Sequence, residues 1–259
     1  MSKTTNNVVI GVIGGMGTLA TLHWFRLVTQ LMGPVPEHQH VHLVIDNNPD
    51  MPDRTKSVTG KGESCEPIII ASAIALERFG ATHLVMPCNV AHAYADAIRA
   101  SVSIPFISII EESAKEAAAI TNAGASLGLL MVDGCLQAGL YQQALKAIDR
   151  VPRVPSDKGQ AEVMNLIYLL KSGENPSVVR HDLKRVTARL IEDGVEALII
   201  GCTELSTALA PEDVAVPCLD TSEILARRVV NLHRAQIGME PVQNLLGPAA
   251  HIPPPTGAC

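Results

Sequence analysis

The sequence has no run of basic residues, no long apolar run and no closely spaced cysteine pair. Its net charge is −6, which argues against nucleic acid and anionic membrane surfaces as partners. No apolar run approaches the roughly 20 residues that are needed to cross a bilayer. Residues 1–7 lead into a predicted strand without the apolar core of a signal peptide, so we expect a cytoplasmic location.

The six cysteines form no CxxC pair, and in a chain of this size we expect them to be reduced thiols. With 47% hydrophobic and only 18% charged residues, the 259-residue chain can bury a substantial core. Its length fits one large domain or two of about 120 residues.

The most informative stretch is GATHLVMPCNVAHAY, residues 80–94. Residues 84–86 predict a short buried strand, Cys88 follows at its carboxyl end, and 91–100 predict a helix. Ligands of open α/β sheets bind at such strand ends, where a helix dipole lowers the pKa of a thiol. The alternative is a small buried cysteine that only fills space.

A second copy of this arrangement favours a functional role for Cys88 over a space-filling one. GVEALIIGCTELSTAL begins at Gly194 and places Cys202 after a predicted strand. Eight positions separate Gly80 from Cys88, and eight separate Gly194 from Cys202. Each unit leads on to another predicted strand. The sequence therefore contains an internal duplication.

The register of the duplication extends upstream. The predicted strand 8–13 resembles 125–130, and Gly11 and Gly128 precede their cysteines by 77 and 74 positions. Two related halves that face each other would bring both cysteines to one cleft from opposite sides.

A glycine-rich turn follows the first predicted strand. Gly15-x-Gly17-x-x-Ala20 fits the dinucleotide fingerprint, but the next predicted strand, 40–45, follows a long proline-containing connection. A turn that admits a small anion at a helix start is therefore favoured over nucleotide binding. Thr18 is expected to cap that helix.

Two further features have alternative interpretations. His38, His40 and His42 alternate on a predicted strand, which suggests a metal site or simply surface residues. Because no carboxylate or cysteine has a supporting spacing, we favour surface residues. Arg54, in the turn-rich segment 47–55, is either a surface charge or a guanidinium group that binds a carboxylate.

Turn signals and periodicity predict the structure of several other segments. We expect loops at 56–65 and 151–158, a turn at 132–135, and a helix at 162–171.

Four motifs together resemble those of the cofactor-independent aspartate/glutamate racemase family: GGMGTLAT, NPDMPDRT, PCNVAH and GCTELS. The resemblance covers nearly the whole chain except the tail. It implies an α/β fold of two similar three-layer domains with pseudo-twofold symmetry, each with a mainly parallel sheet. The first domain would cover 1–110 and the second 111–220. A C-terminal helix at about 221–240 would pack back on the first, and 247–259 would form a loose tail.

The resemblance also implies a reaction. Cys88 and Cys202 would invert the α-carbon of an acidic amino acid, one as base and the other as acid on the opposite face. No pyridoxal phosphate or metal is expected, the partner is a small amino-acid substrate, and the assembly is a homodimer. Arg54 and Lys171 match positions tied to the side-chain carboxylate of aspartate. The expected substrate contacts are Met16, Gly17, Arg54, Asn89, Val90, Cys135, Lys171, Thr203 and Glu204.

The sequence departs from the family pattern at three threonine positions, occupied here by Val90, Val132 and Cys135. A hydrogen bond to a charged group contributes roughly 1.5–3 kcal/mol, so each loss is about a tenfold to hundredfold effect. Either the carboxylate is held differently or the substrate is not plain aspartate. Two other hypotheses stay open: another isomerase or decarboxylase acting on a small dicarboxylate, and a non-catalytic small-molecule binder.

Overall fold

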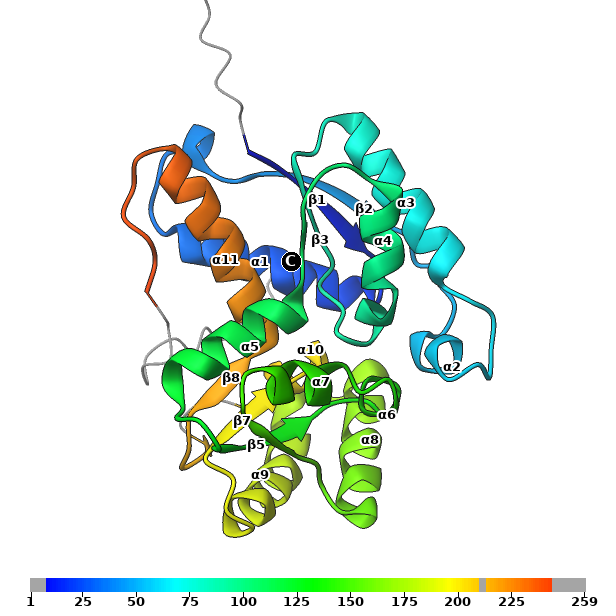
Figure 1. The fold of residues 1–259 in the computed structure, drawn as a ribbon, viewed down its shortest axis with the longest axis vertical. Coiled ribbons are helices and arrows are strands. Elements are labelled where there is room, and N and C mark those ends of the chain that lie inside the picture. Colours follow the sequence, from blue (N-terminus) through cyan, green and yellow to red (C-terminus); the bar gives the residue numbers. More distant parts are fainter. Residues whose placement is uncertain (1–7, 210–212, 244–259) are drawn as a thin grey trace, which may run out of the picture.

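The computed structural model describes residues 8–209 and 213–243 and shows two parallel sheets with helices packed on them (Figure 1). The first sheet has the strand order β2-β1-β3-β4 and the second has β6-β5-β7-β8. The predicted α/β fold is therefore confirmed. Within the described ranges, no helix is long and apolar enough to cross a membrane.

The two halves contain the same series of strands. The elements of the first half are β1 (Val9–Gly14), α1 (Thr18–Met32), η1 (Glu37–Gln39), β2 (His42–Asn47), α2 (Arg54–Val58), α3 (Glu66–Phe79), β3 (His83–Val85), η2 (Val90–Tyr94), α4 (Ala95–Ser101), β4 (Phe106–Ile107) and α5 (Ile109–Ile120). Those of the second half are β5 (Ser126–Leu130), α6 (Asp133–Gln137), α7 (Leu140–Ala147), β6 (Val151–Arg153), α8 (Asp157–Lys171), α9 (Pro176–Glu192), β7 (Ala197–Ile200), α10 (Thr203–Ser206), β8 (Cys218–Asp220) and α11 (Thr221–Gln236).

The duplication inferred from the glycine spacing also appears in the strand register. Gly11 of β1 pairs with Leu84 of β3, and Gly128 of β5 pairs with Leu198 of β7. A Cβ atom would lie 2.8 Å from the Leu84 side chain at Gly11 and 2.6 Å from the Leu198 side chain at Gly128. Both central strands therefore need glycine where the neighbouring leucine packs.

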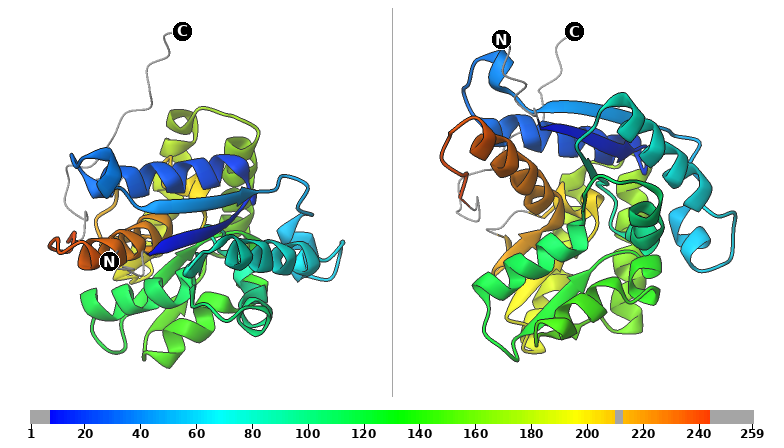
Figure 2. Two further views of the ribbon diagram at one scale, coloured as in Figure 1. Left: turned by 90° about the horizontal axis from the view of Figure 1, so that it is seen from above. Right: turned by 45° about the horizontal axis from the view of Figure 1, so that its top comes forward.

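Helix α11 packs the C-terminal part of the described chain against its N-terminal part. It packs against α1 and α5, and Figure 2 shows it beside α1. At its far end, Gln236 accepts a hydrogen bond from the backbone N–H of Val8 at 2.9 Å. His233 contacts the carbonyl oxygen of Gln39 at 2.8 Å. The predicted tail, residues 247–259, lies outside the described residues.

Two predictions about the first half were wrong. His38 and His40 do not share a strand face with His42, because the chain forms the short helix η1 after Pro36 and β2 begins only at His42. Thr18 does not cap α1. It is the first residue of that helix, and Gly17 occupies the cap position without a side-chain hydrogen bond.

The proline-containing segment 151–158 was wrongly predicted as a loop. Its first three residues form β6, the edge strand of the second sheet, where the missing N–H of Pro152 removes no essential ladder bond. Helix α8 begins five residues earlier than predicted, because the Ser156 side chain accepts a hydrogen bond from the Gly159 N–H at 3.3 Å.

Short helices also replace two segments predicted as irregular. In the predicted loop 56–65, the chain continues α2, which begins at Arg54. The Asp53 carboxylate caps α2 by accepting a hydrogen bond from the Lys56 N–H at 2.8 Å. The predicted turn 132–135 lies mostly within α6. Each helix is only five residues long, too short for sequence periodicity to reveal it.

Candidate active site

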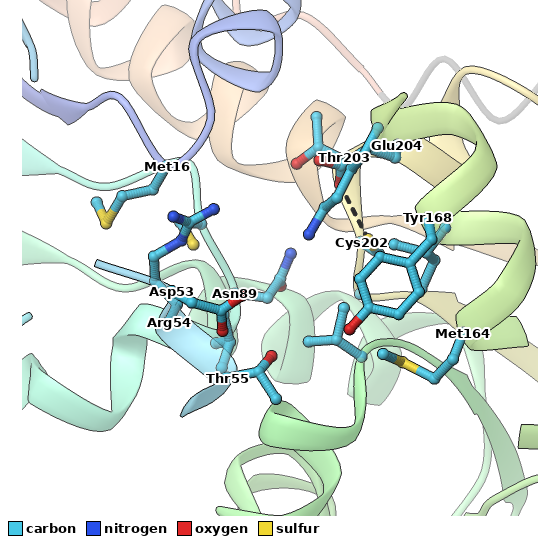
Figure 3. A pocket seen from close by; sticks show the side chains of 16 residues that line it. Met16, Asp53, Arg54, Thr55, Asn89, Met164, Tyr168, Cys202, Thr203 and Glu204 are labelled. Atoms are coloured by element: carbon cyan, nitrogen blue, oxygen red, sulfur yellow. Dashed lines mark hydrogen bonds between the residues drawn. The ribbon is translucent and has the colours of Figure 1, made fainter. Parts of the chain in front are cut away.

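The carboxyl ends of β3 and β7 contribute to one pocket between the halves (Figure 3). Cys88 follows β3 and Cys202 follows β7, so the two copies of the repeated unit each supply a thiol. The lining residues are Met16, Asp53, Arg54, Thr55, Cys88, Asn89, Val90, Val132, Met164, Ile167, Tyr168, Lys171, Gly201, Cys202, Thr203 and Glu204.

Of the eleven residues predicted for the site, nine line this pocket, and Gly17 and Cys135 do not. Gly17 caps α1, one residue beyond the pocket-lining Met16. Cys135 is fully buried within α6. Of the three positions that depart from the family pattern, Val90 and Val132 face the pocket.

Both pocket thiols are buried, with exposed fractions of 8% for Cys88 and 6% for Cys202. Burial raises the pKa of the Cys88 thiol, because a thiolate loses its hydration there. The charge of Arg54, the N–H of Ala91 and the charge of Lys171 act in the opposite direction. The lowered pKa predicted from a helix dipole is therefore wrong, since desolvation exceeds these effects.

Cys202 has a different environment. Burial raises the pKa of its thiol well above the ordinary value, and the Glu204 carboxylate raises it further. The thiol donates a hydrogen bond to Glu204 Oε2 at 3.0 Å. Beside it, the Thr203 hydroxyl accepts a hydrogen bond from Ser222 Oγ at 3.2 Å, which ties this loop to the start of α11. In the free protein Cys202 is therefore a thiol with a carboxylate beside it.

The buried His92 side chain holds the Cys88 loop. Its Nδ1 lies 2.8 Å from the Cys88 carbonyl oxygen, and its Nε2 accepts a hydrogen bond from the Ile109 N–H at 3.1 Å. A carbonyl can only accept and a backbone N–H can only donate, so Nδ1 carries the hydrogen and the ring is neutral. Burial lowers the pKa of His92 to about 4, which agrees with this assignment.

Arg54 and Lys171 supply the cationic groups of the pocket. Arg54 begins α2, and its guanidinium group donates to the carbonyl oxygen of Pro52 at 3.2 Å. Next to it, Thr55 lies against Gly134 of α6, where a Cβ atom would be only 2.9 Å from Thr55 Cα. Gly134 therefore lets the two halves approach closely enough for α2 to border the pocket. Lys171 is the last residue of α8.

One face of α8 forms a wall of the pocket, and most of this wall was not predicted from the sequence. Met164, Ile167, Tyr168 and Lys171 are spaced three or four residues apart, so they share a helix face. The sequence predicts only Lys171 at the site, and helical periodicity is the signal that adds the other three. In Figure 3, Met164 and Tyr168 lie on the side of the pocket opposite Arg54.

The arrangement can move protons. Two thiols from different halves line the same pocket, and two cationic side chains can hold an anion there. In residues 8–209 and 213–243, no cluster of three or more His, Cys, Asp or Glu side chains is placed to hold a metal ion.

Comparisons with known proteins find similar sequences and similar structures. The family model described as Asp/Glu/Hydantoin racemase matches residues 13–229. The "Broad specificity amino-acid racemase RacX" of Bacillus subtilis is 26% identical, over 88% of this chain and 99% of its own. A glutamate racemase of Geobacter metallireducens is 31% identical over 58% of this chain and 56% of its own. The Picrophilus torridus aspartate racemase structure superposes with a TM-score of 0.77 at 24% identity, covering 89% of this chain and 98% of its own.

The buried His92 predicts a pH-dependent loss of stability. The pKa of His92 is about 4 in the folded state, against about 6.5 in the unfolded chain. As the pH falls below 6.5, the imidazole therefore binds a proton in the unfolded chain but stays neutral in the folded protein. The free energy of unfolding should therefore fall by about 3 kcal/mol between pH 7 and pH 4 from this residue alone. Urea unfolding of wild type and His92→Asn across this range measures the contribution.

His92→Asn is a suitable reference because its amide can still donate to the Cys88 carbonyl but does not titrate. Subtracting its profile also cancels Glu223, whose pKa is raised by burial to about 7 and which acts with the opposite sign. Parallel profiles for the two proteins would contradict the prediction. An NMR titration of the wild-type His92 ring gives an independent reading, and a pKa above 6 would also contradict it.

Proposed function

This chain is an amino-acid racemase of the Asp/Glu/Hydantoin racemase family, and we propose that it inverts the α-carbon of aspartate or glutamate with Cys88 and Cys202 as the two proton-transfer groups. The proposal includes catalysis without pyridoxal phosphate or metal. The observation that carries it is the presence of two buried thiols, one from each repeated unit, in a single pocket.

Inversion by proton transfer needs a base on one face of the α-carbon and an acid on the other. A single group would return the proton to the face from which it came. Thiols on two separate strand-end loops avoid this, since Cys88 belongs to the first half and Cys202 to the second. Their roles exchange when the reaction runs in the other direction.

The substrate itself supplies the charge that the buried thiols need. Burial holds both thiols in the neutral form in the free protein. An amino acid brings its ammonium group into the pocket, and a nearby positive charge favours a thiolate. The substrate carboxylates in turn offset the charges of Arg54 and Lys171. Glu204, which accepts the Cys202 hydrogen bond, is placed to receive a proton from that thiol.

The carbanion formed by proton removal spreads its charge onto the α-carboxylate, which needs fixed donors. Asn89 and Thr203 follow the two cysteines directly and line the pocket, so each thiol has an adjacent polar side chain. Both side chains are almost fully buried, at 4% and 5% exposure. A donor in a site that excludes water stabilises negative charge more strongly than a donor in water does.

The pocket contains fewer hydroxyl groups than the family pattern predicts. Val90 and Val132 keep the shape of threonine but cannot donate a hydrogen bond, and Met164 and Ile167 extend the apolar surface. This composition favours a looser grip on the substrate carboxylate. It also suits larger or neutral side chains, in line with the broad specificity named for the Bacillus subtilis relative.

We predict racemisation of aspartate or glutamate that depends on both pocket thiols. Cys88→Ala and Cys202→Ala should each lower kcat by about 10²–10⁴-fold, since each removes one proton-transfer group. Chiral chromatography of a panel of amino acids, with and without chelator, measures the rates. Chelator should have no effect.

Cys218→Ala is the matched control, because Cys218 is a buried free thiol at the start of β8 that does not line the pocket. It should keep wild-type activity. Full activity of either pocket variant, or loss of activity on dialysis that an added cofactor restores, would contradict the proposal.

Restoring one threonine tests the substrate. Val90→Thr should raise kcat/KM for aspartate or glutamate by about tenfold if it regains one hydrogen bond to a charged group. Cys135→Thr restores another family threonine outside the pocket and should leave this value unchanged. Steady-state kinetics on acidic and neutral amino acids measure both. If Val90→Thr improves no acidic amino acid, the aspartate or glutamate assignment is wrong and the family assignment stands.

A further inference from the structure

A hydrogen bond from the second half of the molecule controls one end of the Asn89 side chain. The Tyr141 hydroxyl, on α7, donates to Asn89 Oδ1 at 2.6 Å. Tyr141 is fully buried, and Asn89 is buried and lines the pocket beside Cys88. The hydrogen bond therefore connects a pocket residue, Asn89, with a buried residue outside the pocket, Tyr141.

The surroundings of Tyr141 leave its hydrogen for Asn89. Burial raises the pKa of the Tyr141 phenol well above its usual value, so the group keeps its proton. The hydroxyls of Ser113 and Thr221 are among the groups that influence this phenol. Both already donate to backbone carbonyls, Ser113 to Ile109 at 2.7 Å and Thr221 to Ile200 at 2.9 Å. Tyr141 thus holds the one uncommitted hydroxyl hydrogen of this group.

An amide side chain has an acceptor end and a donor end, and the protein uses them differently here. Tyr141 occupies the oxygen of Asn89, which leaves the NH₂ group for other partners. Figure 3 shows Asn89 between Arg54 and Cys202, in the middle of the pocket. An NH₂ group presented there can donate to an anion, whereas an exposed amide oxygen would select a cation.

We propose that Tyr141 is a positioning residue that fixes the Asn89 amide so that its NH₂ group faces the substrate carboxylate. The inference rests on the proposed function, because it takes the ligand to be an amino acid. Tyr141 touches no substrate and acts only through Asn89. Without its hydroxyl, the amide can rotate and present its oxygen to the carboxylate.

A double-mutant cycle tests this route. Tyr141→Phe removes one hydroxyl and should lower kcat/KM by about tenfold. Because Tyr141 acts through Asn89, the double variant Tyr141→Phe/Asn89→Ala should be no less active than Asn89→Ala alone. A general structural role would instead give losses that multiply. Separate values of KM and kcat show whether the carboxylate is held in the bound state, the transition state or both.

Asn89→Asp tests the direction of the amide. An aspartate still accepts from Tyr141 but directs a negative oxygen at the substrate carboxylate, so activity should fall below that of Asn89→Ala. If the amide oxygen faced the pocket and bound the substrate ammonium group, Asn89→Asp would instead keep or improve activity. That result would overturn the proposal.

Thr187→Val is the control for loss of a buried hydroxyl. Thr187 lies on α9 away from the pocket and donates to the carbonyl oxygen of Lys184 at 2.8 Å. Its activity should equal that of wild type. Unchanged activity of Tyr141→Phe, or multiplied losses in the double variant, would overturn the inference while the racemase assignment stands. A folded wild type that racemises no amino acid would overturn the proposed function, and the role of Tyr141 with it.

Discussion

The structure depends on the burial of two thiols in a pocket where a thiolate is costly. Cys88 and Cys202 are both nearly inaccessible to water, and desolvation is the largest influence on the pKa of each. The surrounding groups reduce this cost without removing it in the free protein. Under the proposed mechanism, the ammonium group of the substrate completes the compensation, so proton transfer becomes favourable only when substrate is bound.

The loops that carry Cys88 and Cys202 follow equivalent strands, but different hydrogen bonds hold them in place. His92, four residues after Cys88, connects that loop to the start of α5. Four residues after Cys202 the chain has Ser206, whose buried hydroxyl has no hydrogen-bond partner in the described part of the protein. There the loop is held through Thr203 and α11 instead. The duplication therefore preserves the position of the thiols, while each has its own polar neighbours.

The sequence revealed the paired thiols because their spacing from a helix-ending glycine is repeated, and spacing is a local property. The strands of both sheets followed from short apolar runs, except β6, where Pro152 concealed an edge strand. Contacts between distant segments could not be predicted. The bond between Tyr141 and Asn89 joins residues 52 positions apart, and the approach of Gly134 to Thr55 depends on how the two halves pack. The lowered pKa expected for Cys88 also failed for this reason, since burial is set by the whole fold.

The isotopic composition of the first product tests the central claim of two opposed thiols most directly. One enantiomer of the best substrate is incubated in deuterated water, and the reaction is stopped at low conversion. With Cys88 and Cys202 on opposite faces, the product should carry solvent deuterium at the α-carbon, while the remaining substrate keeps its original hydrogen. Transfer of the original hydrogen to the product, or equally rapid deuterium uptake into both enantiomers, would show a single base and contradict the account.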